Sequence, residues 1–283
     1  MEEQLTMTLL LEPVDEIDEF IQQDILAIVQ NNAILPAVQF WGHEKLKIDK
    51  ADEHFLKKIM LAVTALSKAN AHRRNHKLVQ DKLLPEIQKY EEIKGTNIDL
   101  LFNKIDSTVA LEGFFSQIKT TLDLLAQSLE YVYGFKLTTW ARKLDKASGK
   151  ELSGLKVVAS LNNLSAEMKK HAQPIAQLIT DNSEEITKIV RIRDSGVHFG
   201  KLNNVQGFRY SVKEKKVVPP IIALSDTEAV YAQEYMEEVL YFISHFVQAF
   251  IVSLLSNLLP DMVVRKSKDG TWNYYSGVKV TPK

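Results

Sequence analysis

Apolar residues recur every three to four positions over several long stretches of this sequence. The most regular stretch covers residues 97–133. Its apolar members are Leu100, Leu101, Ile105, Val109, Phe114, Phe115, Ile118, Leu122, Leu125, Leu129 and Val132. This spacing places one continuous apolar face along a helix, and Gly134, which follows, is a typical helix stop. Such a long face is buried against other helices, so the pattern favours a helical bundle.

Two other regions repeat the helical pattern. Residues 50–93 predict one long helix, or two helices with a kink near Pro85. Residues 155–180 predict a further helix that bends at Pro174. Short connections between helices favour antiparallel neighbours.

The most apolar helix is expected in the last quarter of the chain. Ser225 and Glu228 form a capping box, so we predict a helix from Ser225 to Pro260. Residues 239–259 within it approach the length of a membrane span. Polar side chains interrupt this segment and no basic cluster precedes it, which favours a buried core helix and no membrane partner. The interrupting residues are His245, Gln248 and Asn257.

Short strands are predicted in two places. Residues 205–224 hold two apolar runs around the polar turn at residues 213–216, which is typical of a hairpin. The tail after Lys266 contains Asp269-Gly270 and predicts a second small hairpin. Residues 135–154, with basic side chains and glycines, are expected to form a loop. The fold class is therefore mainly α: a helical bundle of long antiparallel helices with a small β-hairpin insertion.

The chain is predicted to have three parts. Residues 1–95 form an N-terminal helical accessory region, residues 96–260 the main helical bundle, and residues 261–283 a C-terminal tail. Within the first part, residues 1–30 carry acidic side chains and no Lys or Arg, and Pro13 can open a helix there. These acids are interpreted as a solvated face, or else as a surface that docks on a basic one.

Composition excludes several classes of chemistry. Cysteine is absent, which removes disulfides, zinc ribbons and thiol catalysis and fits a reducing cytosol. The acidic N-terminus is unlike a secretory signal, so we expect a cytoplasmic protein. The formal net charge is −1, so a nucleic-acid partner would bind a local basic patch. Neither a P-loop nor a dinucleotide fingerprint nor a nucleophile elbow is present in the sequence, and no cofactor is expected.

A basic cluster at residues 71–77 contains His72 and His76, four positions apart. That spacing can hold a metal ion on one helix face. However, Arg73 and Arg74 lie between the histidines and would repel a divalent cation, so no metal is expected. The cluster is interpreted as a solvated helix face, or as a patch in which both arginines contact RNA phosphates.

The segment at residues 183–203 concentrates chemically useful side chains. It begins as a helix, because Ser183 can cap and two glutamates follow in the first turn. Arg193, Asp194 and His198 then lie close together in the sequence. They resemble the signature of the HEPN superfamily, which is Arg, four to six residues, then His, often with Asn or Asp after the Arg. The order of predicted elements over residues 97–259 is also similar to that family.

The resemblance implies a small helical domain whose catalytic members are metal-independent RNA endonucleases. Such proteins act in antiviral defence or in toxin–antitoxin systems, and they form dimers in which both motifs line one cleft. We therefore expect RNA as the partner, a homodimer, and a regulatory or antitoxin protein. Other members of the superfamily are inactive, so a non-catalytic HEPN-like interaction or ligand-binding protein is the alternative.

The residue types suit RNA cleavage, in which the RNA supplies its own 2′-hydroxyl nucleophile. An imidazole with an ordinary pKa near ~6.5, such as that of His198, suits acid–base work at neutral pH. Arg193 offers a planar fork that matches phosphate oxygens, and Asp194 can orient one of the other two groups. Arg191 and Lys201 would complete a local basic patch.

The spacing of the motif raises a geometric question. Five residues of an ideal helix rotate by about 500°, so Arg193 and His198 lie about 140° apart unless the helix loosens at Gly196. Arg191 is seven residues before His198 and shares its face, which gives a second registration of the motif. A purely structural interpretation also stays open, in which Arg193 and Asp194 form a local ion pair on a surface helix.

Overall fold

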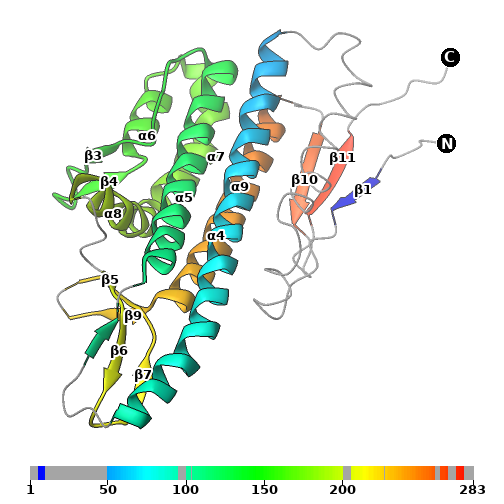
Figure 1. Cartoon of the computed structure of the whole chain (residues 1–283). Helices are drawn as coiled ribbons and strands as arrows, with labels where there is room; N and C mark the ends of the chain where they lie inside the picture. Colours follow the sequence, from blue (N-terminus) through cyan, green and yellow to red (C-terminus); the bar gives the residue numbers. More distant parts are fainter. Residues whose placement is uncertain are drawn as a thin grey trace.

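The computed structural model describes most of the chain between residues 50 and 258, together with three short outlying strands. The described ranges are residues 6–9, 50–94, 100–102, 104–199, 205–225, 227–258, 262–266 and 272–276. Over these residues the fold is mainly helical with small antiparallel strand pairs, as the sequence predicts (Figure 1). The helix expected after Pro13 lies outside the described residues.

Two long helices, α4 (Lys50–Lys94) and α5 (Ile105–Tyr133), pack along each other. Pro85 lies inside α4 and does not divide it into two helices. The helices approach closely at Gly113, where a Cβ atom would lie only 2.4 Å from the His72 ring. Any larger residue at position 113 would require the His72 ring to shift.

The helix α9 (Ala232–Leu258) packs against both long helices and encloses one continuous apolar core. Buried members of this core include Phe55, Leu66, Phe114, Leu122, Trp140, Ile179, Leu240 and Phe250. Burial of each such side chain contributes about 1.5–3 kcal/mol. α4, predicted above as part of the N-terminal accessory region, contributes residues of this core, so residues 50–94 pack as part of the bundle. No helix in the described ranges is long and apolar enough to span a membrane.

The start of α9 differs from the prediction. The Ser225 hydroxyl does accept the N–H groups of Thr227 and Glu228, at 3.3 and 3.1 Å. The chain then continues as β9 (Ala229–Tyr231), and the helix begins only at Ala232. The local bonds of a capping box also close a tight turn, and pairing with a neighbouring strand decides which structure follows.

Five short strands precede α9 and lie at one end of the bundle (Figure 1). They are β5 (Val205–Gln206), β6 (Phe208–Ser211), β7 (Lys216–Val218), β8 (Ile221–Ala223) and β9. The predicted hairpin is the antiparallel pair β6–β7 around a polar turn.

Within the helix predicted over residues 97–133, the residues Leu100–Phe102 form a strand instead. β2 (Leu100–Phe102) pairs with β6, so α5 begins at Ile105. The apolar residues at positions 100–102 therefore belong to a sheet and not to the helix. The other end follows the prediction, because Gly134 ends α5 with φ 75° and its N–H bonds to the Glu130 carbonyl at 2.8 Å.

The tail hairpin is also confirmed. β10 (Met262–Lys266) and β11 (Trp272–Ser276) pair antiparallel. β1 (Thr6–Leu9) joins β11 as a third strand, which the sequence did not predict.

The region between α5 and α8 differs most from expectation. Residues 135–154, predicted as a loop, contain the hairpin of β3 (Arg142–Leu144) and β4 (Glu151–Ser153). The helix predicted over residues 155–180 is two helices, α6 (Leu155–Asn162) and α7 (Ala166–Asp181).

The break between α6 and α7 has a local cause. Ser165 caps α7, since its hydroxyl accepts the Met168 N–H at 3.5 Å. Pro174 lies inside α7. A new helix therefore begins at Ala166.

Candidate functional site

The predicted motif lies on α8 (Ser183–Phe199), whose inner face is apolar and buried. Ile186, Ile189 and Val190 anchor that face in the core. The backbone is helical through Gly196, so the loosening that would bring positions 193 and 198 together is absent from this helix. On it those positions diverge by about 140°, whereas positions 191 and 198 share a face.

Ser183 acts differently from the predicted cap. Its hydroxyl donates to the Thr180 carbonyl at 2.8 Å. The glutamates of the first turn remain, and they suit the positive end of the helix dipole.

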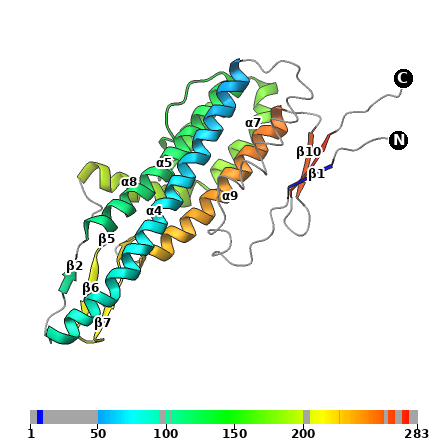
Figure 2. The same ribbon diagram turned by 45° about the vertical axis from the view of Figure 1, so that its right-hand side comes forward.

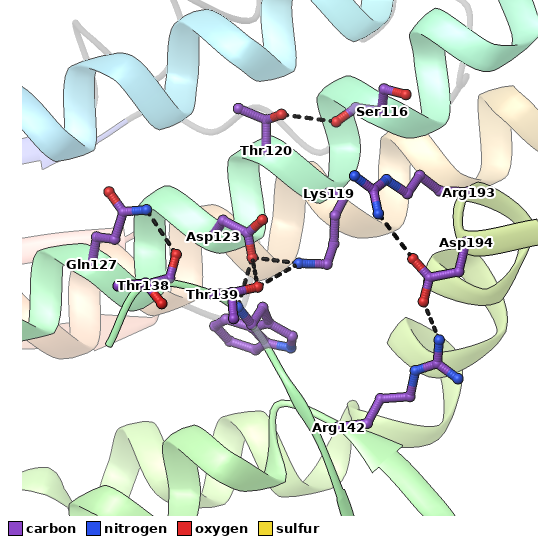
Figure 3. A network of polar contacts seen from close by, with 11 residues as sticks. Ser116, Lys119, Thr120, Asp123, Gln127, Thr138, Thr139, Arg142, Arg193 and Asp194 are labelled. Carbon is purple, nitrogen blue, oxygen red and sulfur yellow. Dashed lines mark hydrogen bonds and ion pairs between the residues drawn. The ribbon is translucent and has the colours of Figure 1, made fainter. Parts of the chain in front are cut away.

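Asp194 is held between two arginines. One carboxylate oxygen accepts from Arg193 Nη1 at 3.1 Å, and the other accepts from Arg142 Nη2, which comes from β3 (Figure 3). We call Arg142, Asp194 and Arg193 the arginine cluster. It carries two positive charges and one negative charge, so its net charge is positive.

The arginine cluster is neither buried nor freely solvated. The side chains of Arg142 and Arg193 are 32% and 33% exposed, and that of Asp194 is 18% exposed. Arg193 Nε is buried and has no hydrogen-bond partner within the described part of the chain. Each guanidinium therefore keeps donors beyond the one that binds Asp194, and planar forks of this kind match phosphate oxygens.

The β3–β4 hairpin delivers Arg142 to α8 and is fixed there at further points. The Ser153 N–H donates to Thr187 Oγ1 at 2.7 Å, and that hydroxyl donates to the Ser183 carbonyl at 2.6 Å. At the solvent edge, Lys150 Nζ lies 3.3 Å from a Glu184 oxygen. The hairpin is thus docked along α8 from its first turn to Asp194.

A second polar network fixes the chain just before β3. Asp123 of α5 accepts from the Trp140 N–H at 2.6 Å, from the Thr139 hydroxyl at 2.8 Å and from Lys119 (Figure 3). Trp140 is fully buried and meets Phe246 edge to face. Arg142 follows two residues later, so its backbone begins from a rigid anchor.

The other predicted site residues are distributed unevenly. Arg191 is exposed on α8. The side chain of His198 and all of Lys201 lie outside the described residues. The arginine cluster therefore holds two of the predicted residues, Arg193 and Asp194, and adds Arg142.

The two arginines on α4 do not belong to this cluster. Arg73 is 5% exposed and binds Glu237 of α9 at 2.8 Å and Asn70 Oδ1 at 3.1 Å, which argues against the predicted RNA contact. Arg74 is exposed, but α5 contacts both α4 and α8 and lies between them (Figures 1 and 2). The sequence pattern missed this because adjacent helical residues point about 100° apart, one inward and one outward.

The neighbouring histidines serve packing in this structure. His76 is fully buried, with Nδ1 3.0 Å from Gln233 Oε1. The His72 ring packs on Gly113. The described residues contain no group of three or more potential ligands arranged to hold a metal ion.

Sequence reasoning missed Arg142 and Asp123. Arg142 lies in a basic segment together with Lys143, Lys146 and Lys150, and nothing in the local sequence distinguishes it from them. Asp123 sits in a helical pattern as an ordinary polar residue. Both acquire their roles from contacts across the fold.

No protein-family model matches this chain, and neither the curated proteins nor the solved structures contain a significant match. The resemblance to the HEPN superfamily therefore stays a prediction from the motif residues and the order of predicted elements.

Proposed function

We propose that this protein is a metal-independent RNA endonuclease of HEPN type that works as a dimer in antiviral defence or as a toxin. The observation that carries the proposal is the arginine cluster. It places Arg193, the first residue of the motif, half-exposed and oriented by Asp194 on a bundle helix. A fixed, partly desolvated guanidinium is suited to a phosphate whose charge grows during reaction.

The proposed reaction needs only the RNA and protein side chains. The 2′-hydroxyl oxygen attacks the adjacent phosphorus, the bond to the 5′-oxygen breaks, and a 2′,3′-cyclic phosphate forms. His198 accepts the 2′-hydroxyl proton, and a His198, of the same or of the second protomer, gives a proton to the leaving 5′-oxygen. Arg193 stabilises the charge on the phosphate oxygens, and Asp194 holds Arg193 in place.

The helical geometry favours a dimer. On a continuous α8, positions 193 and 198 diverge, so one copy does not present both to the same phosphate. Two copies related by a two-fold axis supply each group twice and can place Arg193 of one protomer opposite His198 of the other.

Incubation of the purified protein with total cellular RNA, with and without EDTA, tests the proposal. We expect cleavage in both conditions and 2′,3′-cyclic phosphate ends on the products. Loss of activity in EDTA that Mg²⁺ or Mn²⁺ restores would contradict the metal-independent mechanism. Absence of any cleavage would contradict the endonuclease itself.

A non-catalytic interaction protein is the second candidate. Asp194 already satisfies one donor of each arginine, so the cluster also suits a purely structural role in docking the hairpin. RNA binding without cleavage, or neither, would favour this candidate.

A further inference from the structure

We propose that Arg142 is a second phosphate-binding residue of this site, which deepens the proposed RNA cleavage and rests on it. The motif itself does not include Arg142, which precedes Asp194 by 52 residues and comes from a different element. The inference follows from how one carboxylate places two guanidinium groups.

The carboxylate of Asp194 acts as a spacer. Arg193 takes one of its oxygens and Arg142 takes the other, so the two cations are held on opposite sides of a single small group (Figure 3). Both arginine side chains reach the surface to the same extent, 32% and 33%. Two guanidinium forks of equal exposure, both held by one carboxylate, offer donors to an anion with several oxygens.

The charges favour an anion at this place. The arginine cluster has a net positive charge, and its carboxylate has both oxygens occupied. Each guanidinium has five N–H donors, and Asp194 takes one from each. An RNA phosphate can accept from some of the remaining donors, and bidentate arginine contacts to phosphate are among the strong charge-assisted bonds.

Docking of the hairpin does not depend on Arg142 alone. The bond from Ser153 to Thr187 is buried, and Asp123 holds Trp140 from the other side. If Arg142 served only to attach the hairpin, it would add little stability to these two contacts. The half-exposed guanidinium of Arg142 can therefore bind a ligand. The contacts of Ser153 and Trp140 fix the position of the backbone from which it extends.

Arg142→Ala is the test, and Lys150→Ala is its matched control. Lys150 also joins the hairpin to α8 by an ion pair, but its partner is Glu184 in the first turn, and both side chains are well exposed. The probe is a short single-stranded RNA oligonucleotide, and the measurements are its Kd across a salt series and the kcat and KM of its cleavage.

Removal of Arg142 should weaken RNA binding by about tenfold and reduce the slope of log K against log salt by about 0.7, as expected for one lost phosphate contact. KM should rise and kcat should change little, because this arginine binds substrate and transition state alike. Lys150→Ala should behave as the parent does.

The outcomes separate the two proposals. If the parent cleaves RNA and Arg142→Ala matches Lys150→Ala in Kd and salt slope, Arg142 is a structural residue only and the inference fails. If the parent neither binds nor cleaves RNA, the proposed function fails, and this inference with it. If Arg142→Ala does not fold, Arg142→Gln decides: it removes the charge and keeps N–H donors that can reach Asp194, so unchanged binding and salt slope would overturn the inference, and weaker binding with a smaller slope would support it.

Discussion

At the scale of single residues, the Asp194 carboxylate makes two kinds of contact, one local in the sequence and one across the fold. Along the chain it is the neighbour of Arg193, and across the fold it is the partner of Arg142. Its position between two cations makes it a positioning residue in the proposed mechanism.

Substitutions in the motif test the assignment of roles. Arg193→Ala and His198→Ala should each abolish RNA cleavage while leaving the circular-dichroism spectrum and thermal unfolding close to those of the parent. Arg191→Ala should reduce cleavage less, because its exposed side chain contributes only to the basic surface. A greater loss with Arg191→Ala than with Arg193→Ala would move the motif to the other registration, and parental activity in both motif variants would rule out the site.

Gly154, between β4 and α6, combines a left-handed backbone with a crowded environment. Its φ is +86°, and a Cβ atom there would lie 2.7 Å from Trp140 Nε1 and 2.8 Å from an Ile179 methyl. Gly154→Ala should therefore lower the free energy of unfolding by about 2–4 kcal/mol, from left-handed strain plus overpacking.

Gly149 supplies the control for that substitution in urea unfolding. Its φ is also positive, at +69°, but no described atom lies within 4 Å of the added Cβ. Gly149→Ala should cost only about 1–2 kcal/mol, the strain alone. Equal losses of unfolding free energy in Gly154→Ala and Gly149→Ala would show that Trp140 and Ile179 shift to accommodate the added Cβ without an energetic cost.

At the scale of elements, the β3–β4 hairpin and α8 form one unit. Local sequence gives the hairpin little reason to form, since its strands have three residues each. Contacts with α8 supply the missing stability, because isolated short hairpins are marginal in water.

The buried hydroxyl of Thr187 links these two elements. Thr187→Val keeps the shape of the side chain but leaves the Ser153 N–H without its acceptor, so we expect a loss of about 1–3 kcal/mol in urea unfolding. Thr180→Val is the control, because Thr180 is exposed and its hydroxyl donates to the Ala176 carbonyl within α7. Comparable stability of the two variants would argue that a water molecule or a shifted hairpin satisfies Ser153.

At the scale of the whole molecule, a buried polar layer joins α4 to α9. It consists of the ion pair of Arg73 with Glu237 and the contact of His76 with Gln233. Burial lowers the pKa of His76 below its ordinary value of 6.5, and the hydrogen bond with Gln233 acts in the opposite direction. Burial also lowers the pKa of His72.

These histidines should make the fold less stable in acid. Above the ordinary pKa both the folded and unfolded states hold neutral imidazoles, so His76 adds no pH dependence. As the pH falls through 6.5 the unfolded chain takes up a proton that the folded protein resists, so the free energy of unfolding decreases.

Urea unfolding at about pH 7.5 and at about pH 5 measures this change. His76→Gln should show a smaller loss between the two pH values than the parent, whatever its absolute stability. His171→Gln, which alters an exposed histidine of α7, is the control and should keep the parental loss. If His76→Gln loses as much unfolding free energy between the two pH values as the parent does, other groups cause the loss of stability in acid.

The proposed mechanism also predicts the size of the functional particle. Light scattering at micromolar concentration should give the mass of a dimer, and a structure of that dimer should place the two Arg193–His198 segments facing each other. A strict monomer, or a dimer with these segments on opposite outer faces, would remove the main physical support for the nuclease.

The sequence by itself determined the features that depend on neighbours along the chain. The apolar period predicted α4, α5 and the body of α9, Gly134 predicted the end of α5, and the polar turn predicted the β6–β7 hairpin. In each case the signal lies within a few residues of the structure that it specifies. The HEPN-like motif is local in the same sense.

Only the tertiary structure decided the features that join distant segments. Pairing with β6 makes Leu100–Phe102 a strand, and the pairing of β9 with β8 places the start of α9 at Ala232. The fold also buries Arg73 against Glu237, 164 residues away, and brings Arg142 to Asp194. The physical reason is that a side chain's charge and shape are local, whereas its partner and its burial depend on which elements pack against it.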